Sequence, residues 1–251
     1  MSLLSIGTST KTIKSDKSNS PYRTAILYLA PADTVSGINI CPMAVRAGCR
    51  AACLYKAGRG AFSNVQAGRI RKTEYYRDNP GGFVVDLILD IEREQRKARR
   101  KGYQLAVRLN GTSDIFWEQY GIFQRFPDVQ FYDYTKNFNA RRLARIDRIP
   151  NYHITVSYSQ TSPQYARKVI GQTAANIAAV FSAQAFAALG SHYALPGGRM
   201  LPVLNGDITD ERFLDPDDQQ YLVALVAKGP AAKNDETGFV IREVKNLAVA
   251  I

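Results

Sequence analysis

Three cysteines carry the residue type and the spacing from which chemistry can most directly be inferred. Cys41, Cys49 and Cys53 form a C-x7-C-x3-C pattern, and they are all the cysteines of the 251-residue sequence. Cys49 and Cys53 are four residues apart, so a helical turn would point their sulfurs the same way. Gly48 would let the backbone fold Cys41 back toward them. Thiolates gathered in this way favour a soft metal or an iron–sulfur cluster.

The number of thiols limits the kind of metal site. Three thiolates do not complete a four-ligand zinc set, and the two histidines, His153 and His192, lie far away in the sequence. Three protein ligands with one open position are typical of catalytic zinc, or of a [4Fe–4S] cluster whose remaining iron binds a substrate or cofactor. The alternative is a set of free buried thiols, since cysteine is often a small core residue. The confinement of all three to one loop favours the metal or cluster.

Three aspartates that follow apolar runs are the candidate catalytic residues. They are Asp114, Asp133 and Asp207. A carboxylate at the end of a strand can act as a nucleophile or as a general acid/base. If the strands form a barrel, we expect Asp114 and Asp207 to open into the same pocket as the cysteines. The alternative is that both cap the helices that follow, as aspartate commonly does.

The segment before the first of these aspartates is a candidate cofactor-binding turn. Asn110, Gly111 and Ser113 occur in the sequence Asn-Gly-Thr-Ser-Asp. Glycine permits a ligand to approach the backbone closely, and the amide and hydroxyl groups supply donors and acceptors. These three residues are therefore expected to contact a cofactor.

The charge of the chain indicates a polyanionic partner. The sequence has 33 Lys and Arg against 22 Asp and Glu, a net charge of +11, and its pI is about 9.6. Such an excess favours phosphate backbones, and basic residues interleaved with Tyr55, Tyr75 and Tyr76 suit phosphate neutralisation plus base stacking. The alternative is a solvated helix face. The candidate nucleic-acid-binding residues are Arg46, Arg50, Lys56, Arg59, Arg69, Arg71 and Lys72.

Apolar runs and helical spacings alternate along the chain. The near-continuous runs are typical of parallel strands, and the segments between them have helical periodicity. The predicted strands are 24–30, 104–110, 129–134, 153–158, 176–182, 200–204 and 221–227. The predicted helices are 64–76, 83–101, 115–126, 140–146, 164–171 and 184–189.

This alternation predicts an α/β fold with a parallel sheet. A partial or full β/α barrel of the TIM type is favoured over an open doubly wound sheet, and residues 24–251 are expected to form a single domain. Residues 1–23 are read as a polar arm. The sequence has no apolar run of membrane-spanning length and no signal-peptide core, so a cytoplasmic protein without a membrane partner is expected.

The cysteine loop also resembles a known family. The segment from Ile40 to Gly60, followed by Asn64-Val-Gln-Ala67 and Arg71, is similar to the bacteriophage "gene product 88" family, whose role is unassigned. The likeness continues through the strand ending in Asp114 and covers roughly residues 24–160. A more distant similarity of placement is to radical S-adenosylmethionine barrels, which implies cluster-binding cysteines after the first strand and S-adenosylmethionine contacts at the Gly111–Asp114 turn.

These observations lead to one favoured function and two alternatives. The favoured hypothesis is a phage-type enzyme that modifies nucleic acid, with DNA bases as the expected target, through a [4Fe–4S] cluster or zinc held by the cysteines. The first alternative is a base-exchanging transglycosylase barrel that uses the aspartates as nucleophile and general acid/base. The second is a basic nucleic-acid-binding protein with a structural metal and no catalytic activity.

Overall fold

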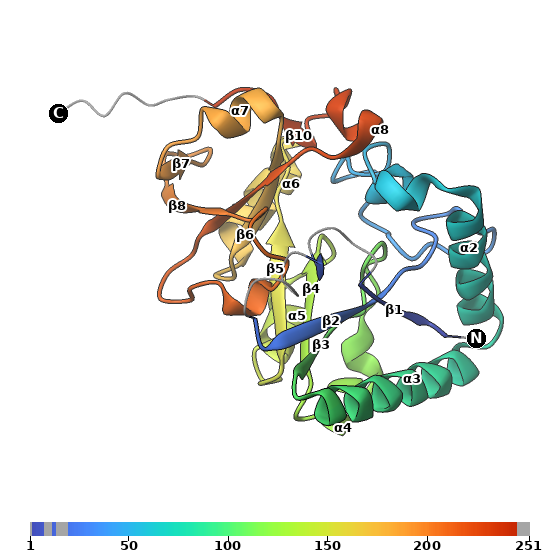
Figure 1. Ribbon diagram of the computed structural model, residues 1–251. Helices are drawn as coiled ribbons and strands as arrows, with labels where there is room; N and C mark the ends of the chain where they lie inside the picture. Colours follow the sequence, from blue (N-terminus) through green and yellow to red (C-terminus); the bar gives the residue numbers. More distant parts are fainter. Residues whose placement is uncertain (1, 8–11, 14–19, 245–251) are drawn as a thin grey trace.

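The fold is a mixed α/β structure built on one large sheet (Figure 1). It is taken from a computed structural model, which describes residues 2–7, 12–13 and 20–244. The ten strands are β1 (Leu4–Ile6), β2 (Tyr22–Leu27), β3 (Gln104–Arg108), β4 (Gln130–Thr135), β5 (Tyr152–Ser157), β6 (Ile177–Phe181), β7 (His192–Ala194), β8 (Met200–Asn205), β9 (Leu222–Val226) and β10 (Val240–Ile241).

The helices lie in the connections between the strands. The α-helices are α2 (Ser63–Asp78), α3 (Pro80–Lys101), α4 (Ile122–Arg125), α5 (Ala140–Ile146), α6 (Pro163–Gln172), α7 (Ala183–Ala187) and α8 (Gly229–Lys233). Short 3-10 helices are η1 (Leu54–Lys56), η2 (Gly58–Ala61), η3 (Trp117–Tyr120) and η4 (Arg212–Leu214).

The sheet order is β1-β2-β3-β4-β5-β6-β9-β8-β7, with β10 paired to β6. Strands β2, β3, β4, β5, β6, β9 and β8 are parallel, while β1 and β7 pair antiparallel with β2 and β8. The mostly parallel α/β class is therefore confirmed. The order of the described strands begins at β1 and ends at β7 and is not closed, so the closed barrel stays a prediction.

The longest helix forms where the sequence provides both of its ends. Asn79 caps α3 by accepting the Gly82 amide at 2.9 Å, and Pro80 occupies the first turn. Gly102 ends the helix in the left-handed conformation, with φ 73°. Between these ends, Phe83, Leu87 and Ile91 are fully buried in one hydrophobic cluster with β3.

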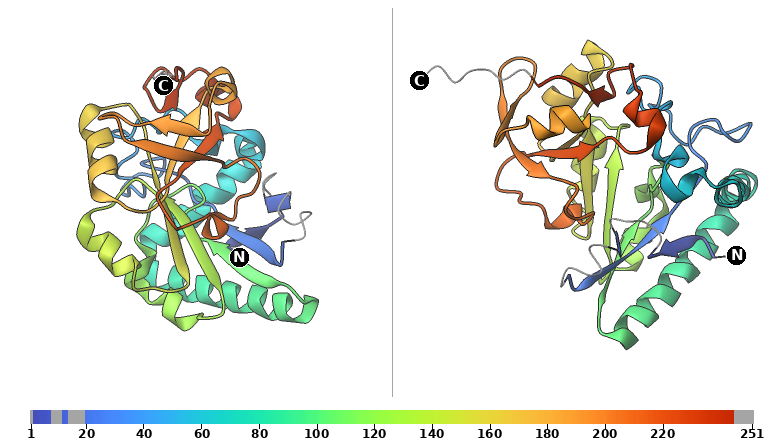
Figure 2. Two further views of the ribbon diagram at one scale, coloured as in Figure 1. Left: turned by 90° about the vertical axis from the view of Figure 1, so that its left-hand side faces the viewer. Right: turned by 45° about the horizontal axis from the view of Figure 1, so that its top comes forward.

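Helices α3, α4, α5, α6 and α7 cover one face of the sheet. Alternate strand residues, such as Val107 in β3 and Val156 in β5, point into two hydrophobic clusters that contain α3, α4, α5, α6 and α7. The sheet twists along its length, and the two further views in Figure 2 show it turning from β2 to β7. Figure 1 shows α2 and α3 near β1 and β2, and α8 near β10.

Strands β5 and β6 separate at their carboxyl ends. They pair only through Val156 with Ile177 and Ser157 with Ala178. Further along, β10 takes the place of β5 beside β6, at Val180 and Phe181. In open α/β sheets, ligands are commonly bound in the crevice outside the carboxyl ends of the strands. The candidate site is therefore sought at this edge.

Two structural findings concern the chain's first residues and its longest helices. Leu4–Ile6, in the predicted polar arm, form β1 with Leu27, Ile26 and Ala25 as their register partners. Residues 8–11 and 14–19 of that arm lie outside the described residues. In the part of the chain that the structure describes, no helix has the length and apolar character needed to cross a membrane.

Candidate functional site

The cysteine loop crosses the carboxyl edge of the sheet. The Cys41 thiol lies 3.6 Å from the carbonyl oxygen of Thr112, in the turn after β3. At the other end of the loop, η1 packs against α8, which follows β9. The loop therefore spans the edge from β3 toward β9, where functional residues of α/β sheets gather.

Gly48 fixes the middle of this loop. Its φ is +73°, and a β-carbon there would overlap the Thr161 hydroxyl, which follows β5, and approach the Thr237 hydroxyl, which precedes β10. Those two hydroxyls donate to the carbonyl oxygens of Ala47 and Gly48 at 3.2 and 3.1 Å. The loop is therefore anchored where β5 and β6 separate, and only glycine suits both the conformation and the space.

The predicted helical turn around Cys49 and Cys53 is wrong. Residues 42–52 form consecutive turns, and Cys53 is extended, with ψ 137°, before η1 begins. The positive φ of Gly48 interrupts the helical path just before Cys49. Glycine thus bends the loop before Cys49, and the extended conformation of Cys53 departs from the helical turn that the four-residue spacing suggested.

The three thiols nevertheless lie within electrostatic reach of one another. The pKa of Cys41 is raised to about 12, chiefly by burial. The nearby Asp114, Cys53 and Cys49 also act to raise it, whereas a hydrogen bond from the backbone of Ala32 acts to lower it. Burial also raises the pKa of Cys53, while Lys136 and Arg69 act to lower it. Both thiols are therefore protonated at neutral pH, which does not suit a free nucleophilic thiolate.

The donor set suits a soft metal, whereas its arrangement is not that of a formed site. Thiolate ligands select zinc, copper(I) or iron–sulfur clusters. Among the described residues, no three Cys, His, Asp or Glu side chains are positioned to hold a metal ion. Metal binding would therefore require the turns of the loop to tighten around a common point, and it would release the thiol protons.

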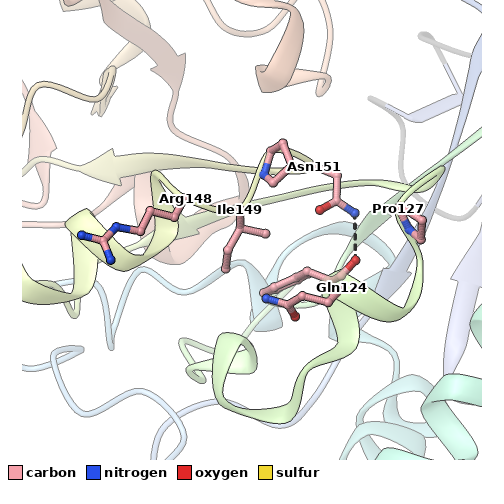
Figure 3. A pocket seen from close by; sticks show the side chains of 7 residues that line it. Gln124, Pro127, Arg148, Ile149 and Asn151 are labelled. Atoms are coloured by element: carbon pink, nitrogen blue, oxygen red, sulfur yellow. Dashed lines mark hydrogen bonds between the residues drawn. The ribbon is translucent and has the colours of Figure 1, made fainter.

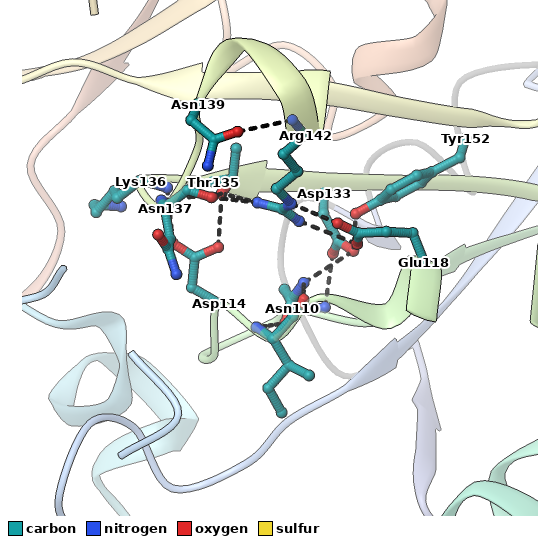
Figure 4. A network of polar contacts seen from close by, with 11 residues as sticks. Asn110, Asp114, Glu118, Asp133, Thr135, Lys136, Asn137, Asn139, Arg142 and Tyr152 are labelled. Carbon is teal, nitrogen blue, oxygen red and sulfur yellow. Dashed lines mark hydrogen bonds and ion pairs between the residues drawn. The ribbon is translucent and has the colours of Figure 1, made fainter. Parts of the chain in front are cut away.

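Asp114 lies near Cys41, and its carboxylate accepts hydrogen bonds from the loop that follows β4. It accepts hydrogen bonds from the Thr135 hydroxyl at 2.7 Å and from the amides of Lys136 and Asn137 at 2.8 and 3.0 Å (Figure 4). Its own amide donates to Ile40, next to Cys41, at 2.8 Å. Asp114 therefore ties the cysteine loop to the segment after β4 and leaves little acceptor capacity for a ligand.

Asp133 and Asn110 form the core of the same network. The Asp133 carboxylate accepts from the Asn110 amide at 2.6 Å, the Asn110 side chain at 3.2 Å and the Tyr152 hydroxyl at 3.3 Å. Burial raises the pKa of Asp133 to about 7, although these donors and Arg108 act to lower it. The Asn110 oxygen in turn accepts from the Ser113 hydroxyl and from Trp117. Asn110, Ser113 and Asp133 are thus bonded to one another rather than to an open space.

The remaining predicted residues of this edge also have structural partners. Gly111 lies so close to β2 that a β-carbon would meet Ile26 and the Leu27 carbonyl oxygen at 2.6 and 2.7 Å. Asp207 follows β8, two strands beyond β6 in the sheet, and accepts from the Val226 amide and the Lys228 ammonium at 2.8 and 2.6 Å. The structure therefore brings Asp114 and Asp133 close to the cysteine loop and gives Asp207 a separate pairing with β9.

The predicted nucleic-acid-binding residues divide into exposed and buried groups. The exposed ones surround the cysteine loop, and Arg50 forms an ion pair with Asp33 at 2.7 Å. Lys72 is half-buried and donates to the Leu3 carbonyl oxygen at 2.6 Å, so it holds β1 rather than facing solvent. Arg69 is only 9% exposed. The exposed residues are Arg46, Arg50, Lys56, Arg59 and Arg71.

These positions belong to a chain whose family can now be named. A family model described as "Gene product 88" matches residues 2–243. The chain belongs to this family. The comparisons with curated proteins and with solved structures gave no match. The match confirms the similarity predicted from the cysteine loop, and it extends well beyond residue 160, where the similarity was expected to end.

In this Gene product 88 protein, sequence reasoning missed two charged side chains at the edge, Arg142 and Lys136. Arg142 in α5 is 1% exposed and pairs with Glu118 at 2.6 Å, and it also donates to Thr135. Lys136 donates to Ser157 on β5 at 3.1 Å. Arg142 sits in a basic run that looks like a solvated helix face, so no sequence pattern could have separated it from its exposed neighbours. Lys136 directly follows a predicted strand, and that position was the available signal.

The face of the sheet away from the helices is unexpectedly polar. Arg108 on β3 stacks over the Tyr134 ring at 4.7 Å and pairs with Asp210 at 3.3 Å, and Tyr132 donates to the same carboxylate at 2.9 Å. The apolar runs predicted a sheet covered by apolar contacts on both faces. Instead the segment around η4 crosses this face near β5, and it supplies charged partners in place of a helix.

Two surface pockets lie apart from the thiols. One, of about 270 Å³, is lined by Gln124, Pro127 and Arg148 and borders Asn151 (Figure 3). The Asn151 side chain donates to the carbonyl oxygens of Phe123, Phe126 and Val129. It lies beside the amino end of β5, opposite the cysteine edge. The other, of about 690 Å³, lies between Gln160, the turn after β7 and residues 235–243.

Proposed function

We propose that this Gene product 88 protein binds nucleic acid across its carboxyl edge and acts on it through a thiophilic metal or iron–sulfur cluster held by Cys41, Cys49 and Cys53. The observation that carries the proposal is the position of the loop. Three mutually interacting thiols lie in a loop that crosses the carboxyl edge of the sheet, and exposed basic residues lie in that loop and in the segments that follow it. Both features suit a nucleic-acid substrate approaching that edge.

Metal chemistry fits the buried thiols better than a free thiol does. A protonated buried cysteine is a poor nucleophile, whereas a metal cation displaces the proton and stabilises the thiolate. The bound group would supply a Lewis acid or an electron-transfer centre. The chain's own residues would hold that group, and Asp114 would keep the loop against the turn after β4. Asn110 and Ser113 are bonded to each other, so we propose no S-adenosylmethionine contact for them.

The aspartate alternative receives no support from the geometry. A transglycosylase needs a nucleophilic carboxylate that is free to meet the sugar carbon. Asp114 and Asp133 each accept three hydrogen bonds from the protein. The thiol loop is therefore the better candidate for the reactive centre.

Metal analysis tests the first half of the proposal. Protein prepared without oxygen is expected to contain zinc, or iron and sulfide, and replacement of Cys41, Cys49 or Cys53 by Ser should each remove most of it. Val45→Ser is the matched control, because Val45 lies exposed in the same loop and carries no thiol. If wild type holds no thiophilic metal after anaerobic preparation and reconstitution, the metal centre is wrong.

Salt-dependent binding tests the second half. Replacing the five exposed residues Arg46, Arg50, Lys56, Arg59 and Arg71 by Ala should weaken DNA binding and reduce the slope of log K against log salt by about 3 to 4. The control replaces Arg96, Arg99, Arg100 and Lys101, an exposed basic group where α3 ends at the opposite edge of the sheet. Equal losses in the two variants would mean that DNA does not bind at the cysteine edge.

A further inference from the structure

Arg69 is a buried charge without a carboxylate partner. It is 9% exposed, and among the described residues it forms no ion pair: the groups that act on its charge are Tyr28, Tyr55 and Cys53. Its Nε and Nη1 atoms are shielded from solvent and have no hydrogen-bond partner in the described structure. An arginine stays charged in a protein, and burying a charge unpaired is costly. A bound anion is one physical explanation of such a group.

The surroundings hold this guanidinium in a fixed orientation. Its central carbon lies 4.6 Å from the Tyr28 ring centre and 5.6 Å from that of Tyr55. Gly60 closes over it, since a β-carbon there would lie 3.1 Å from Nη1. One turn later in α2, Thr73 donates to the Arg69 carbonyl oxygen and accepts the Ala30 amide, at 3.0 and 2.8 Å. These contacts dock α2 on the end of β2 and aim Arg69 at the cysteine edge.

A second cation, Lys136, acts on the same thiol as Arg69. Lys136 lies within electrostatic reach of Cys53, as Arg69 does, and both charges act on that thiol. The Lys136 ammonium donates to Ser157 and lies 5.7 Å from the Phe239 ring centre, and in the described part of the chain it too forms no ion pair with a carboxylate. Arg69 on α2 and Lys136 after β4 therefore both act on the charge of Cys53, and neither forms an ion pair with a carboxylate in the described part of the chain.

We propose that Arg69 and Lys136 form an anion-binding site beside Cys53 that takes the phosphate group of a nucleotide. The Nη2 atom of Arg69 belongs to both pairs of parallel N–H groups that a guanidinium can offer, one with Nε and one with Nη1. Because Nε and Nη1 are shielded from solvent, binding a phosphate through either pair requires the covering residues around Gly60 to shift. The bound phosphate then satisfies one of the two partnerless nitrogens, and bidentate charge-assisted bonds are the strong kind. The assignment of the phosphate to a nucleotide rests on the proposed function, whereas the anion site itself does not.

This site gives the nucleic acid a defined place. The exposed basic residues in and after the loop attract a phosphate backbone without positioning it, because their side chains are solvated and can adopt several rotamers. A buried, oriented guanidinium instead fixes one phosphate relative to Cys53. The reacting nucleotide would then be held next to the thiols while its neighbours remain on the exposed basic surface.

Direct binding of small anions tests the site. We expect wild type to bind deoxyadenosine monophosphate and inorganic phosphate at low salt, with the nucleotide binding more tightly, in calorimetric titrations. Arg69→Met and Lys136→Met should each weaken binding by about tenfold or more, because each removes charge-assisted hydrogen bonds. Arg77→Met, which removes an arginine of the same helix that pairs with Asp78 at the surface, should change it less than about twofold.

Stability and thiol variants separate the proposal from its competitors. Arg69→Met should leave the melting temperature unchanged or raise it, because an unpaired buried charge is removed; a structural arginine would lower it. Lys136→Met tests the same site without touching α2. The triple Cys→Ser variant should still bind phosphate, whether or not wild type holds a metal.

Three outcomes would overturn the inference. The first is no phosphate binding by wild type at millimolar concentration. The second is an equal effect of Arg69→Met and Arg77→Met. The third is loss of metal, rather than of phosphate, on changing Arg69, which would make the cations counter-charges of the thiolates. Phosphate bound no more weakly than the nucleotide would overturn the nucleotide assignment. The phosphate and nucleotide titrations do not depend on whether the cysteines bind metal, which the metal analysis measures separately.

Discussion

Asp133 offers the sharpest test of the polar network, because its charge state should make stability depend on pH. Burial raises the pKa of this carboxyl from its ordinary 3.8 to about 7. The native state therefore binds the Asp133 proton more tightly than the unfolded chain does. The stability that this proton provides is fully present below the unfolded pKa and is lost as pH rises through the folded pKa.

The size of the effect follows from the two pKa values. Between about pH 5.5 and about pH 8.5, linkage predicts that wild type loses about 2 kcal/mol of unfolding free energy through this one group. Other groups act in the opposite direction, since the folded pKa of Asp90 is lowered even though burial opposes this, through bonds from Leu3, Leu4 and Arg93. A matched variant is therefore needed to isolate Asp133.

Asp133→Asn removes the titration while keeping the side chain's size. Denaturant unfolding of both proteins at the two pH values gives a difference of differences, in which wild type should lose about 2 kcal/mol relative to the variant on going to the higher pH. Asp128→Asn is the control, because Asp128 is 72% exposed and pairs only with Arg99 at the surface. Parallel pH dependences for wild type and Asp133→Asn would refute a proton held at this carboxyl.

Two further predictions concern the loop and the buried ion pair. Gly48→Ala should lower the free energy of unfolding more than Gly102→Ala does, because both glycines have φ +73° but only Gly48 lacks space for a β-carbon. We expect a loss of about 1 kcal/mol for Gly102→Ala and of about 2 kcal/mol or more for Gly48→Ala. Equal losses in denaturant unfolding would contradict the close approach at Gly48. Arg142→Met should destabilise by about 3 to 5 kcal/mol, since it leaves the Glu118 carboxylate buried and unpaired. Arg99→Met, which breaks an exposed pair, should change stability by less than about 1 kcal/mol in the same assay.

The sequence was sufficient to locate most of the regular elements. All seven predicted strands are present as β2, β3, β4, β5, β6, β8 and β9, with ends displaced by a few residues. Continuous apolar runs identify such strands because successive residues point to opposite faces of the sheet and residues on both faces are buried. The six predicted helices also correspond to helical segments, although 115–126 is divided into η3 and α4 at Gly121, whose φ is +67°.

The elements that were missed depend on their partners rather than on their own residues. Strands β1, β7 and β10 have three, three and two residues, too few for a periodic pattern. Each exists because a longer strand offers free backbone groups beside it. The most consequential is β10, since its insertion beside β6 creates the divergence against which the cysteine loop is anchored.

The candidate site was predicted in position more than in detail. The expectation that Asp114 and Asp207 open into one pocket with the cysteines stays a prediction: the charge of Asp114 acts on Cys41, whereas Asp207 is bonded to Val226 at the end of β9. What spacing could not indicate is how those polar groups are used. Loops that cross a sheet edge bury backbone amides and carbonyls, and each buried group must find a partner. Asn110, Asp114 and Asp133 meet that need.

The function of the edge should therefore be sought in groups whose hydrogen bonds are not satisfied within the protein. A polar residue whose every bond is satisfied inside the protein stabilises the loops, whereas a group that is buried, charged and without a partner raises the free energy of the ligand-free protein. Within the described residues, Arg69 is such a group beside the thiols. In the sequence it looked like one of several solvated arginines around the cysteine loop. Its burial separates it from them, because a cation kept at a cost in stability is the expected signature of a site that binds an anion.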